Sequence, residues 1–227
     1  SGNANNGEVV GAIRTTDRFG NENSAYYFDG SNDYILVKTP IFSSEDRKNT
    51  VNIWVNHQGS RGGEIFNDNN QLKFTYYYDE SPNGIGLTGY SSGSYNGSDL
   101  NGALTNDNWY MVTFVSFPNE DTENSGSMEM VHEWYVNGNF INRTASYYDP
   151  EGSFSLENKL WIGIGDGRSN NNPFKGKLDD IRIYLDALSG DEVRELYDRE
   201  SKSNNYDLVN NVVIPSGSLE TEAYVYA

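Results

Sequence analysis

The sequence places a carboxylate where a β-strand is expected to bury its side chains. The segment GKLDDIRIY, residues 176–184, reads as a strand in which Ile181 and Ile183 share one face. In a period-2 strand, Asp179 has the same phase as these two isoleucines. A buried carboxylate must be protonated, paired with a cationic or hydrogen-bonding group, or bound to a cation.

Two kinds of partner could satisfy Asp179. Within the chain, Arg18, Arg182 or the amides of a turn could hold it, although lysine and arginine are scarce. The other partner is a calcium ion, which takes about six to eight oxygen ligands from carboxylates, carbonyls and water. The residues alone leave both possibilities open.

Tyrosine-rich segments outside the expected core pattern indicate a carbohydrate-binding surface, because sugar C–H faces stack on aromatic rings and sugar hydroxyls suit amides and carboxylates. These segments are FTYYYDE (74–80), GYSSGSYNGSDLNG (89–102), ASYYDP (145–150) and GDGRSNNNPF (165–174). The alternative is that these tyrosines line sheet edges and that the loops are simply solvated. The candidate ligand-binding residues are Tyr76, Tyr78, Tyr90, Tyr95, Tyr147, Asp166 and Arg168.

A pair of catalytic carboxylates is not predicted. Glycosidases need two carboxyl groups about 5–10 Å apart. The nearest case is MEMVHEW (128–134), where Glu129 and Glu133 share a strand face but lie about 13 Å apart along it. We therefore assign no catalytic residue.

The elements that must position these residues are mostly strands. Short runs rich in Val, Ile, Tyr, Phe and Trp alternate with clusters of Gly, Asn, Asp and Ser, which predicts an all-β sandwich or barrel. Asn137-Gly138 in VNGNF is expected to form a tight hairpin turn. The four tryptophans fall on expected core phases and are interpreted as packing residues: Trp54, Trp109, Trp134 and Trp161.

One helix is predicted, over residues 188–200. Ser189 and Glu192 form an S-x-x-E capping box, and Leu188 can pack against Val193. The apolar stripe of this helix is narrow, so we expect it to lie on the sandwich rather than inside it. The tail after residue 200 could supply further strands or a tether.

Composition narrows the possible partners. Sixteen basic residues against 33 acidic ones give a formal net charge of −17. Such a surface repels nucleic acids and anionic membrane faces but tolerates cations and neutral glycans. The chain has no cysteine, which excludes disulfides and thiol chemistry, and it has no apolar run long enough to span a membrane.

Six segments, in their order and spacing, resemble the laminin G-like, concanavalin A-like jelly rolls that are common in secreted bacterial proteins. The resemblance covers about residues 8–198. It implies an all-β, two-sheet antiparallel jelly-roll sandwich with one short C-terminal helix. The segments are AYYFDGSNDYILV (25–37), TVNIWVNHQG (50–59), NWYMVTFV (108–115), EWYVNGNFI (133–141), LWIGIG (160–165) and FKGKLDDIRIYLDALSGDEVRELY (174–197).

The resemblance also implies a structural calcium ion where the last long strand lies near an early hairpin. Its expected ligands are the carboxylates of Asp179 and Asp29 and a carbonyl of Gly30, with Asp180 and Asp33 in reserve.

The resemblance favours a non-catalytic binding or adhesion module for a polysaccharide, glycan or glycoprotein, located outside the cell or at its surface. The alternative is a polysaccharide lyase or glycoside hydrolase that uses the concave face. His57, His132, Arg61 and Gln58 are residue types that lyases use, but the expected lyase motifs are absent. A third possibility is a structural spacer without a ligand.

We expect residues 1–200 to form the jelly roll and residues 201–227 to form an extension. No signal pattern is present at the start, so we expect a removed signal or a segment of a longer chain. A monomer, or one domain of a longer multidomain chain, is expected, with no nucleic-acid partner and no membrane insertion.

Overall fold

The computed structural model describes residues 6–39, 41, 48–59, 63–67, 72–78, 85–91, 94–98, 104–122, 129–147, 159–165, 172–202 and 222–224. At 72–78, 85–91, 94–98, 146–147 and 222–224, the description is of the backbone.

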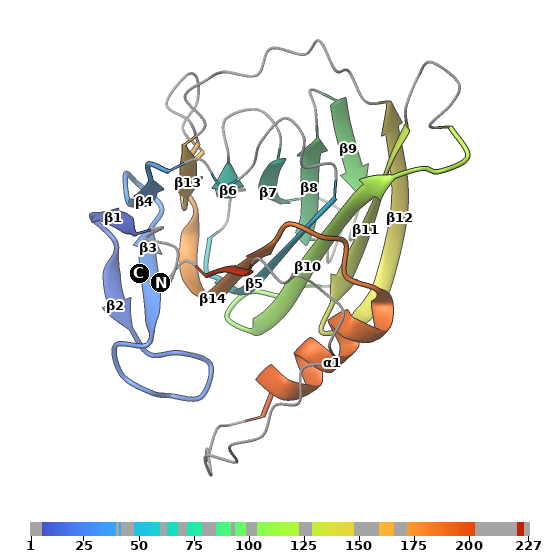
Figure 1. Cartoon of the computed structure of the whole chain (residues 1–227). Helices are drawn as coiled ribbons and strands as arrows, with labels where there is room; N and C mark the ends of the chain where they lie inside the picture. Colours follow the sequence, from blue (N-terminus) through green and yellow to red (C-terminus); the bar gives the residue numbers. More distant parts are fainter. Residues whose placement is uncertain are drawn as a thin grey trace.

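The described chain forms fifteen strands and one helix, arranged as two sheets with the helix against one of them (Figure 1). The elements are β1 (Gly7–Val10), β2 (Ile13–Thr15), β3 (Ala25–Asp29), β4 (Tyr34–Val37), β5 (Asn49–His57), β6 (Gly63–Asn67), β7 (Leu72–Tyr78), β8 (Ile85–Ser91), β9 (Ser94–Ser98), β10 (Trp109–Pro118), β11 (Glu129–Val136), β12 (Asn139–Tyr147), β13 (Leu160–Ile162), β14 (Lys175–Tyr184), α1 (Gly190–Glu200) and β15 (Glu222–Tyr224).

The strands pair antiparallel within two sheets. The seven-stranded sheet has the order β1-β4-β13-β6-β7-β8-β9. The eight-stranded sheet has the order β12-β11-β10-β5-β14-β3-β2, and β15 pairs with β14 beside this path. The predicted two-sheet antiparallel sandwich with one short helix is confirmed.

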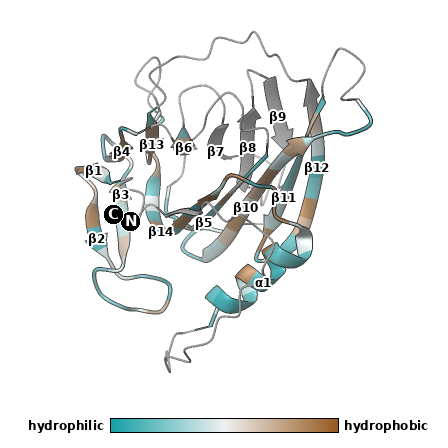
Figure 2. Cartoon of the chain, in the orientation of Figure 1, coloured by the Kyte–Doolittle hydropathy of each residue, from teal (hydrophilic) through white to brown (hydrophobic). Residues whose placement is uncertain are grey.

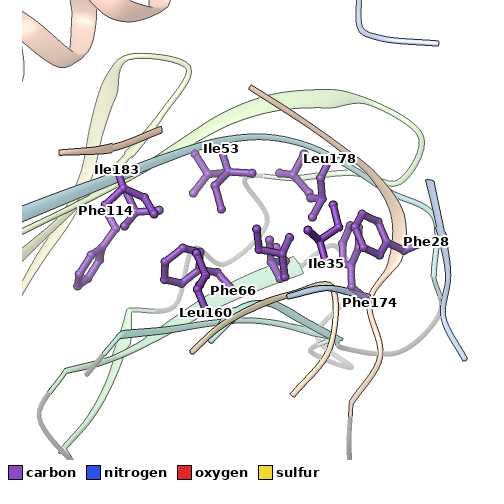
Figure 3. Close-up of a cluster of buried hydrophobic side chains, with 14 of the residues drawn as sticks. Phe28, Ile35, Ile53, Phe66, Phe114, Leu160, Phe174, Leu178 and Ile183 are labelled. Carbon is purple, nitrogen blue, oxygen red and sulfur yellow. The ribbon is translucent and has the colours of Figure 1, made fainter. Parts of the chain in front are cut away.

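The hydrophobic core lies between the two sheets, and Figure 3 shows its side chains filling the space between the two layers. Phe66 and Ile162 enter it from the seven-stranded sheet, and Ile53, Phe114 and Leu178 enter it from the eight-stranded sheet. Alternation along each strand sends every second apolar side chain to this layer. Below, the face of each sheet turned away from this core is called its outer face.

A smaller hydrophobic cluster covers part of the outer face of the eight-stranded sheet. Trp54 and Met111 contribute from β5 and β10, and Val193 and Leu196 contribute from α1. Strand β5 is therefore buried on both faces, with Val51, Ile53 and Val55 alternating into the core and Trp54 in the outer cluster. Figure 2 shows α1 as mainly hydrophilic, as expected for a helix with one narrow buried stripe.

Local signals in the sequence account for the ends of these elements. The Ser189 side chain accepts from the Glu192 backbone N–H, and the Glu192 carboxylate accepts from the Ser189 backbone, so the predicted capping box is present. Asn137 and Gly138 adopt φ values of 51° and 71°, which the predicted hairpin turn requires.

The C-terminal segment adds a strand. In β15, Ala223 lies opposite Ile183 of β14, beyond the part of β14 that pairs with β3. The proposed domain boundary near residue 200 stays a prediction. Within the part of the chain that the structure describes, α1 is too short and too polar to cross a bilayer, and no other helix is present.

Candidate functional site

The two outer faces of the sandwich differ. The centre of the eight-stranded sheet is covered by α1, whereas no described helix lies on the seven-stranded sheet. On β13, Leu160 and Ile162 are buried in the core with 2% and 0% of their surface exposed. Trp161 stands between them and is half-buried on the outer face.

Trp161 has an aromatic partner on the neighbouring strand. The ring of Tyr34 in β4 lies 5.1 Å from the Trp161 ring, centroid to centroid, at an interplanar angle of 55°. Both side chains are half-buried, so each keeps solvent-accessible ring surface. This aromatic pair is a surface on which a sugar ring could stack.

On the other side of Trp161, a polar pair occupies the same face. Asn67 lies directly opposite Trp161, and its side-chain Nδ2 donates to Oε2 of Glu64 at 2.9 Å. Glu64 and Asn67 are three residues apart, so in a regular strand they would point to opposite faces. A register shift between Glu64 and Phe66 brings both to one face.

The Glu64 carboxylate is buried beneath neighbouring backbone. Only 3% of Glu64 is exposed, and its backbone N–H donates to the carbonyl of Asn172 at 2.7 Å. A Cβ atom added at Gly165 would lie 2.9 Å from Glu64 Oε2, so glycine permits the chain to pass this close to the carboxylate. Asn67 is likewise only 6% exposed, so the acidic acceptor and the amide adjoin the aromatic pair as a buried pair.

Four of the five predicted ligand-binding tyrosines lie in the seven-stranded sheet, on two different phases. Tyr90 of β8 lies opposite Tyr95 of β9 and opposite Lys73 of β7, which itself lies opposite Asn67. Tyr90 and Tyr95 are therefore in phase with Asn67 and Trp161.

Tyr76 and Tyr78 have the other phase, since they lie two and four residues from Phe74 along β7. Phe74 itself lies opposite the core residue Phe66. Tyr147 lies opposite Glu129 in the eight-stranded sheet. The remaining two predicted residues, Asp166 and Arg168, lie outside the described residues. The ligand-binding role of all seven residues stays a prediction.

Sequence reasoning missed Trp161, Glu64 and Asn67. The interpretation of all four tryptophans as core residues is wrong for Trp161, because the apolar run Leu-Trp-Ile gives no alternation from which to assign its face. Trp134 lies in the main core, and Trp54 and Trp109 pack in the cluster beneath α1.

Asp179 does not share a face with Ile183. The structure places Asp179 opposite Trp54, on the outer face of the eight-stranded sheet, while Ile183 points into the core. A register shift between Asp179 and Arg182 interrupts the alternation, and Asp180 adopts a φ of 45° at this point. The premise of regular alternation was therefore wrong, although Asp179 is buried as expected.

Arg18 holds the Asp179 carboxylate. Its Nη1 lies 2.6 Å from Asp179 Oδ2, and its Nη2 lies 2.8 Å from Asp180 Oδ2. The guanidinium also stacks 4.4 Å from the Trp54 ring and donates to the backbone carbonyl of Glu200. Arg18 was one of the partners that the sequence left open, and it ties the segment before β3 to β14 and to the end of α1.

A second ion pair completes this charged cluster. Glu200 is 5% exposed, and its Oε1 lies 2.6 Å from Nη1 of Arg182. Its Oε2 accepts from the indole Nε1 of Trp54 at 2.8 Å. The charged groups in contact here are Arg18, Asp179, Asp180, Arg182 and Glu200, and they are called the charged cluster below.

Burial dominates the protonation of this cluster. Desolvation, followed by the neighbouring charge of Asp180, raises the pKa of Asp179 from 3.8 to about 7, and Arg18 opposes the shift. Desolvation also raises the pKa of Glu200, against the attraction of Arg182. Burial therefore makes Asp179 and Glu200 take up a proton more readily than they would in the unfolded chain.

The other two predicted calcium ligands lie at a different place on β14. Asp29 is opposite Lys175, four residues from Asp179, which corresponds to about 13 Å along the strand. The Asp29 carboxylate accepts from the Ser31 backbone N–H at 2.7 Å, and Gly30 adopts a φ of 80° in this turn. Among the described residues, no three acidic or histidine side chains are grouped as a metal site. Calcium binding stays a prediction.

The two histidines lie far apart. His132 is fully buried and stacked 5.3 Å from Phe114, and burial lowers its pKa to about 4. His57 pairs with Asn106 at the other end of β5. Because Ser116 lies opposite both His132 and Asn49, the separation along β5 is eight residues, or about 26 Å. The two imidazoles cannot act on one substrate atom.

Glu129 and Glu133, the nearest approach to a catalytic pair in the sequence, have protein partners. Glu129 accepts from the Asn119 side chain at 2.7 Å. Glu133 accepts from the Tyr135 hydroxyl at 2.6 Å, and burial and this bond raise the pKa of Tyr135.

Two antiparallel sheets around one core, with a helix on one outer face and aromatic and amide side chains on the other, define a lectin-like jelly-roll sandwich. The chain belongs to the concanavalin A-like lectin/glucanases superfamily, whose sequence model matches residues 29–194. Among curated proteins, none matches the sequence significantly.

Solved structures share the fold. A native heptameric SAP-like pentraxin from Limulus polyphemus is 18% identical, with a TM-score of 0.55 over 75% of this chain and 80% of the pentraxin. Domain 4 of an extracellular arabinanase from Geobacillus stearothermophilus, solved in complex with arabinotriose, is 17% identical, with a TM-score of 0.55 over 83% and 82%.

The binding domain of botulinum neurotoxin serotype D is 15% identical, with a TM-score of 0.57 over 87% of this chain. This chain spans about half of that domain, 48% of its length. At these identities, the likeness to all three structures concerns the fold.

Proposed function

We propose that this chain is a non-catalytic binding module that recognises a glycan or glycoprotein outside the cell or at its surface. The observation that carries the proposal is the outer face of the seven-stranded sheet. It carries the half-buried Tyr34–Trp161 pair, and the hydrogen-bonded Asn67–Glu64 pair is buried beside it. The accessible ring surface suits the apolar C–H face of a sugar, and the buried polar pair fixes the position of the strand beside it.

The similar structures support a binding role without fixing the ligand. The arabinanase domain was solved with arabinotriose, and the neurotoxin structure is described as a binding domain. A net charge of −17 agrees with a neutral or glycoprotein partner rather than a nucleic acid. The separation of His57 from His132 and the engagement of Glu133 with Tyr135 disfavour the lyase or hydrolase alternative.

Calcium stabilisation is a separate part of the proposal. The turn that contains Asp29, Gly30 and Asp33 is rich in oxygen atoms, and a calcium ion there would stabilise the folded chain by mass action. Asp179 is paired with Arg18 about 13 Å along β14 from this turn, so the proposed ion would be held without it.

A glycan array tests the binding function, with the chain applied once in calcium and once in chelator. We expect binding to a defined set of carbohydrates. The bound polysaccharides are then incubated with the chain and assayed for new reducing ends and for unsaturated uronates. Product formation would identify an enzyme, and an array without any bound glycan would contradict the proposal.

A further inference from the structure

An exposed ion pair lies on the same face of the seven-stranded sheet as the aromatic pair. Across β1, β4 and β13, Glu8 lies opposite Leu36, and Leu36 lies opposite Trp161. Residues directly opposite one another in antiparallel strands share a face. Because Trp161 is on the outer face, Leu36 and Glu8 are on it as well. The core positions of Ile35 and Val37, on either side of Leu36, agree with this assignment.

Lys38, the residue after β4, reaches the same face. Its Nζ forms an ion pair with Oε2 of Glu8. The pKa of Lys38 is raised, first by its hydrogen bond to Glu8 and then by the charge of Glu8, and the neighbouring Tyr34 adds to the shift. Tyr34 therefore lies within electrostatic reach of the ammonium group. The five residues that meet here are called the β4 patch below: Glu8, Tyr34, Leu36, Lys38 and Trp161.

Every side chain of the β4 patch keeps accessible surface. The side chains of Lys38 and Glu8 are 66% and 55% exposed. Tyr34, Leu36 and Trp161 are half-buried. Leu36 lies between Glu8 and Trp161 across the sheet, and it alternates with the other two patch residues along β4. The β4 patch therefore has an apolar centre, with the aromatic pair at one corner and the ion pair at the opposite corner.

The accessible part of this face is bounded on two sides. Strand β1 is the edge of the sheet, and the residue opposite Trp161 on β6 is Asn67, which is only 6% exposed. The β4 patch therefore spans three strands, or about 10 Å from Glu8 to Trp161. Along β4, the four residues from Tyr34 to Lys38 correspond to about 13 Å. An area of this size accommodates about two sugar units.

The ion pair can hydrogen-bond to sugar hydroxyls without an excess of charge. The Glu8 carboxylate accepts hydrogen bonds and the Lys38 ammonium group donates them, whereas a hydroxyl group does both. An anionic sugar would have to displace Glu8 from Lys38, in a chain whose net charge is −17. The β4 patch therefore favours a neutral sugar.

We infer that the β4 patch binds one or two neutral sugar units, which stack on the Tyr34–Trp161 pair and direct hydroxyl groups to Glu8 and Lys38. This inference rests on the proposed function. It adds the size and the charge of the ligand, and it assigns part of the specificity to an ion pair. Because only about two sugar units contact the β4 patch, the further units of a longer chain contribute little to the affinity.

Isothermal titration with sugars of increasing length tests the size of the site. The probes are the methyl glycosides of glucose, galactose, mannose, xylose and arabinose, with di- and tetrasaccharides of the same sugars. Methyl glucuronide and methyl galacturonide are the anionic comparison. We expect one neutral series to bind, with an affinity that rises from one to two units and changes by less than about threefold from two to four. The uronides should bind more weakly than this neutral series.

Substitution of Glu8 tests the role of the ion pair. Glu8→Gln keeps the length of the side chain but removes the charge that neutralises Lys38. The affinity for the neutral disaccharide should fall at least about threefold, because hydrogen bonds to a charged acceptor are the stronger ones. The affinity for the uronides should rise, because Lys38 is then unpaired. Lys38→Met should weaken the neutral disaccharide without a gain for the uronides. A purely structural role of the ion pair would not reverse the preference.

Matched variants control for the loss of a charge and of a ring. Asp198→Asn removes the carboxylate of another exposed ion pair, on α1, and should bind both kinds of sugar like the wild type. Trp161→Ala should lower the affinity for the neutral disaccharide at least about tenfold. Phe140→Ala, at a ring that is 54% exposed on the other sheet, should leave it unchanged. Binding that survives Trp161→Ala in the folded variant would place the ligand elsewhere and overturn the inference.

The outcomes separate the inference from the proposed function. Affinities that do not respond to Glu8→Gln and Lys38→Met, or that keep rising beyond two units, would overturn the β4 patch while leaving a glycan-binding module. A wild type that prefers the uronides would overturn the neutral ligand. Absence of binding to any carbohydrate, here and on the array, would overturn both. If Trp161→Ala does not fold, Glu8→Gln and Lys38→Met carry the test, since both side chains are exposed.

Discussion

Substitution of Asp179 by Asn should make the folded chain more stable at pH 8 than the wild type, and the advantage should disappear toward pH 4. Burial raises the pKa of the Asp179 carboxyl from 3.8 to about 7 in the folded state. Between these values the folded chain holds a proton that the unfolded chain releases. The contribution of Asp179 to the free energy of unfolding therefore falls as the pH rises through this window.

The magnitude follows from the size of the shift. A raise of about three pKa units corresponds to about 4 kcal/mol at full ionisation. Asparagine resembles the protonated carboxyl, so the variant avoids this cost. Arg18 keeps Asp180 and the carbonyl of Glu200 as partners in the variant.

Urea denaturation measures the difference in the free energy of unfolding between the variant and the wild type. Unfolding is followed by tryptophan fluorescence in chelator, at several pH values from about 4.5 to 8, which is the window of the shift. The two free energies of unfolding are compared at each pH. His132 contributes a pH dependence of the opposite sign to both proteins, and this contribution cancels in the difference. The lowered pKa of His132 makes the folded state lose stability as the pH falls from 6.5 to about 4.

Asp198→Asn, at an exposed carboxylate of α1, is the matched control and should show no such trend. A variant that becomes less stable than the wild type as the pH rises would show that the ion pair with Arg18 outweighs burial, and would refute the reasoning.

Three further predictions concern other parts of the fold. If calcium occupies the early hairpin, chelator should lower the Tm of the wild type, and Asp29→Asn should remove most of that response. The site would be excluded if the wild type contained no bound ion by elemental analysis and its Tm did not respond to chelator. Trp54→Phe should cost about 1–3 kcal/mol in urea denaturation, since the buried Glu200 carboxylate loses its indole donor; an unchanged midpoint would count against that bond. Gly138→Ala should lower the Tm by destabilising the folded state by at least about 1 kcal/mol, because φ is 71° and the added Cβ would meet Tyr197 Cβ at 2.9 Å; a neutral substitution would mean that the hairpin relaxes.

Features of the fold with local signals were predictable from the sequence. The S-x-x-E box at Ser189 specifies the start of α1, and Asn137-Gly138 specifies a hairpin, because in both cases the interacting groups are a few residues apart. The sandwich class followed from many short strands with turn residues between them.

The candidate site was less predictable, because it depends on pairing between distant strands. The face of Trp161 is undetermined in a run of three apolar residues, and the proximity of Glu64 to Asn67 on one face requires a register shift. Arg18 and Asp179 are 161 residues apart in the chain, so Arg18 could be named as a partner only among alternatives. Tyr90 and Tyr95 were selected for residue type, and the register then placed them opposite each other.

The central claim is that a glycan binds the outer face of the seven-stranded sheet, and the four tryptophan indoles report on it directly. Trp54 and Trp109 pack beneath α1, Trp134 lies in the core, and Trp161 lies on the outer face of the seven-stranded sheet. In 15N-resolved NMR spectra, titration with a glycan that binds on the array should shift the indole N–H resonance of Trp161 and leave the other three in place. The Trp161 resonance is assigned by its loss in Trp161→Phe. Shifts confined to Trp54 or Trp109, with Trp161 unmoved, would place the ligand on the opposite face and contradict the account.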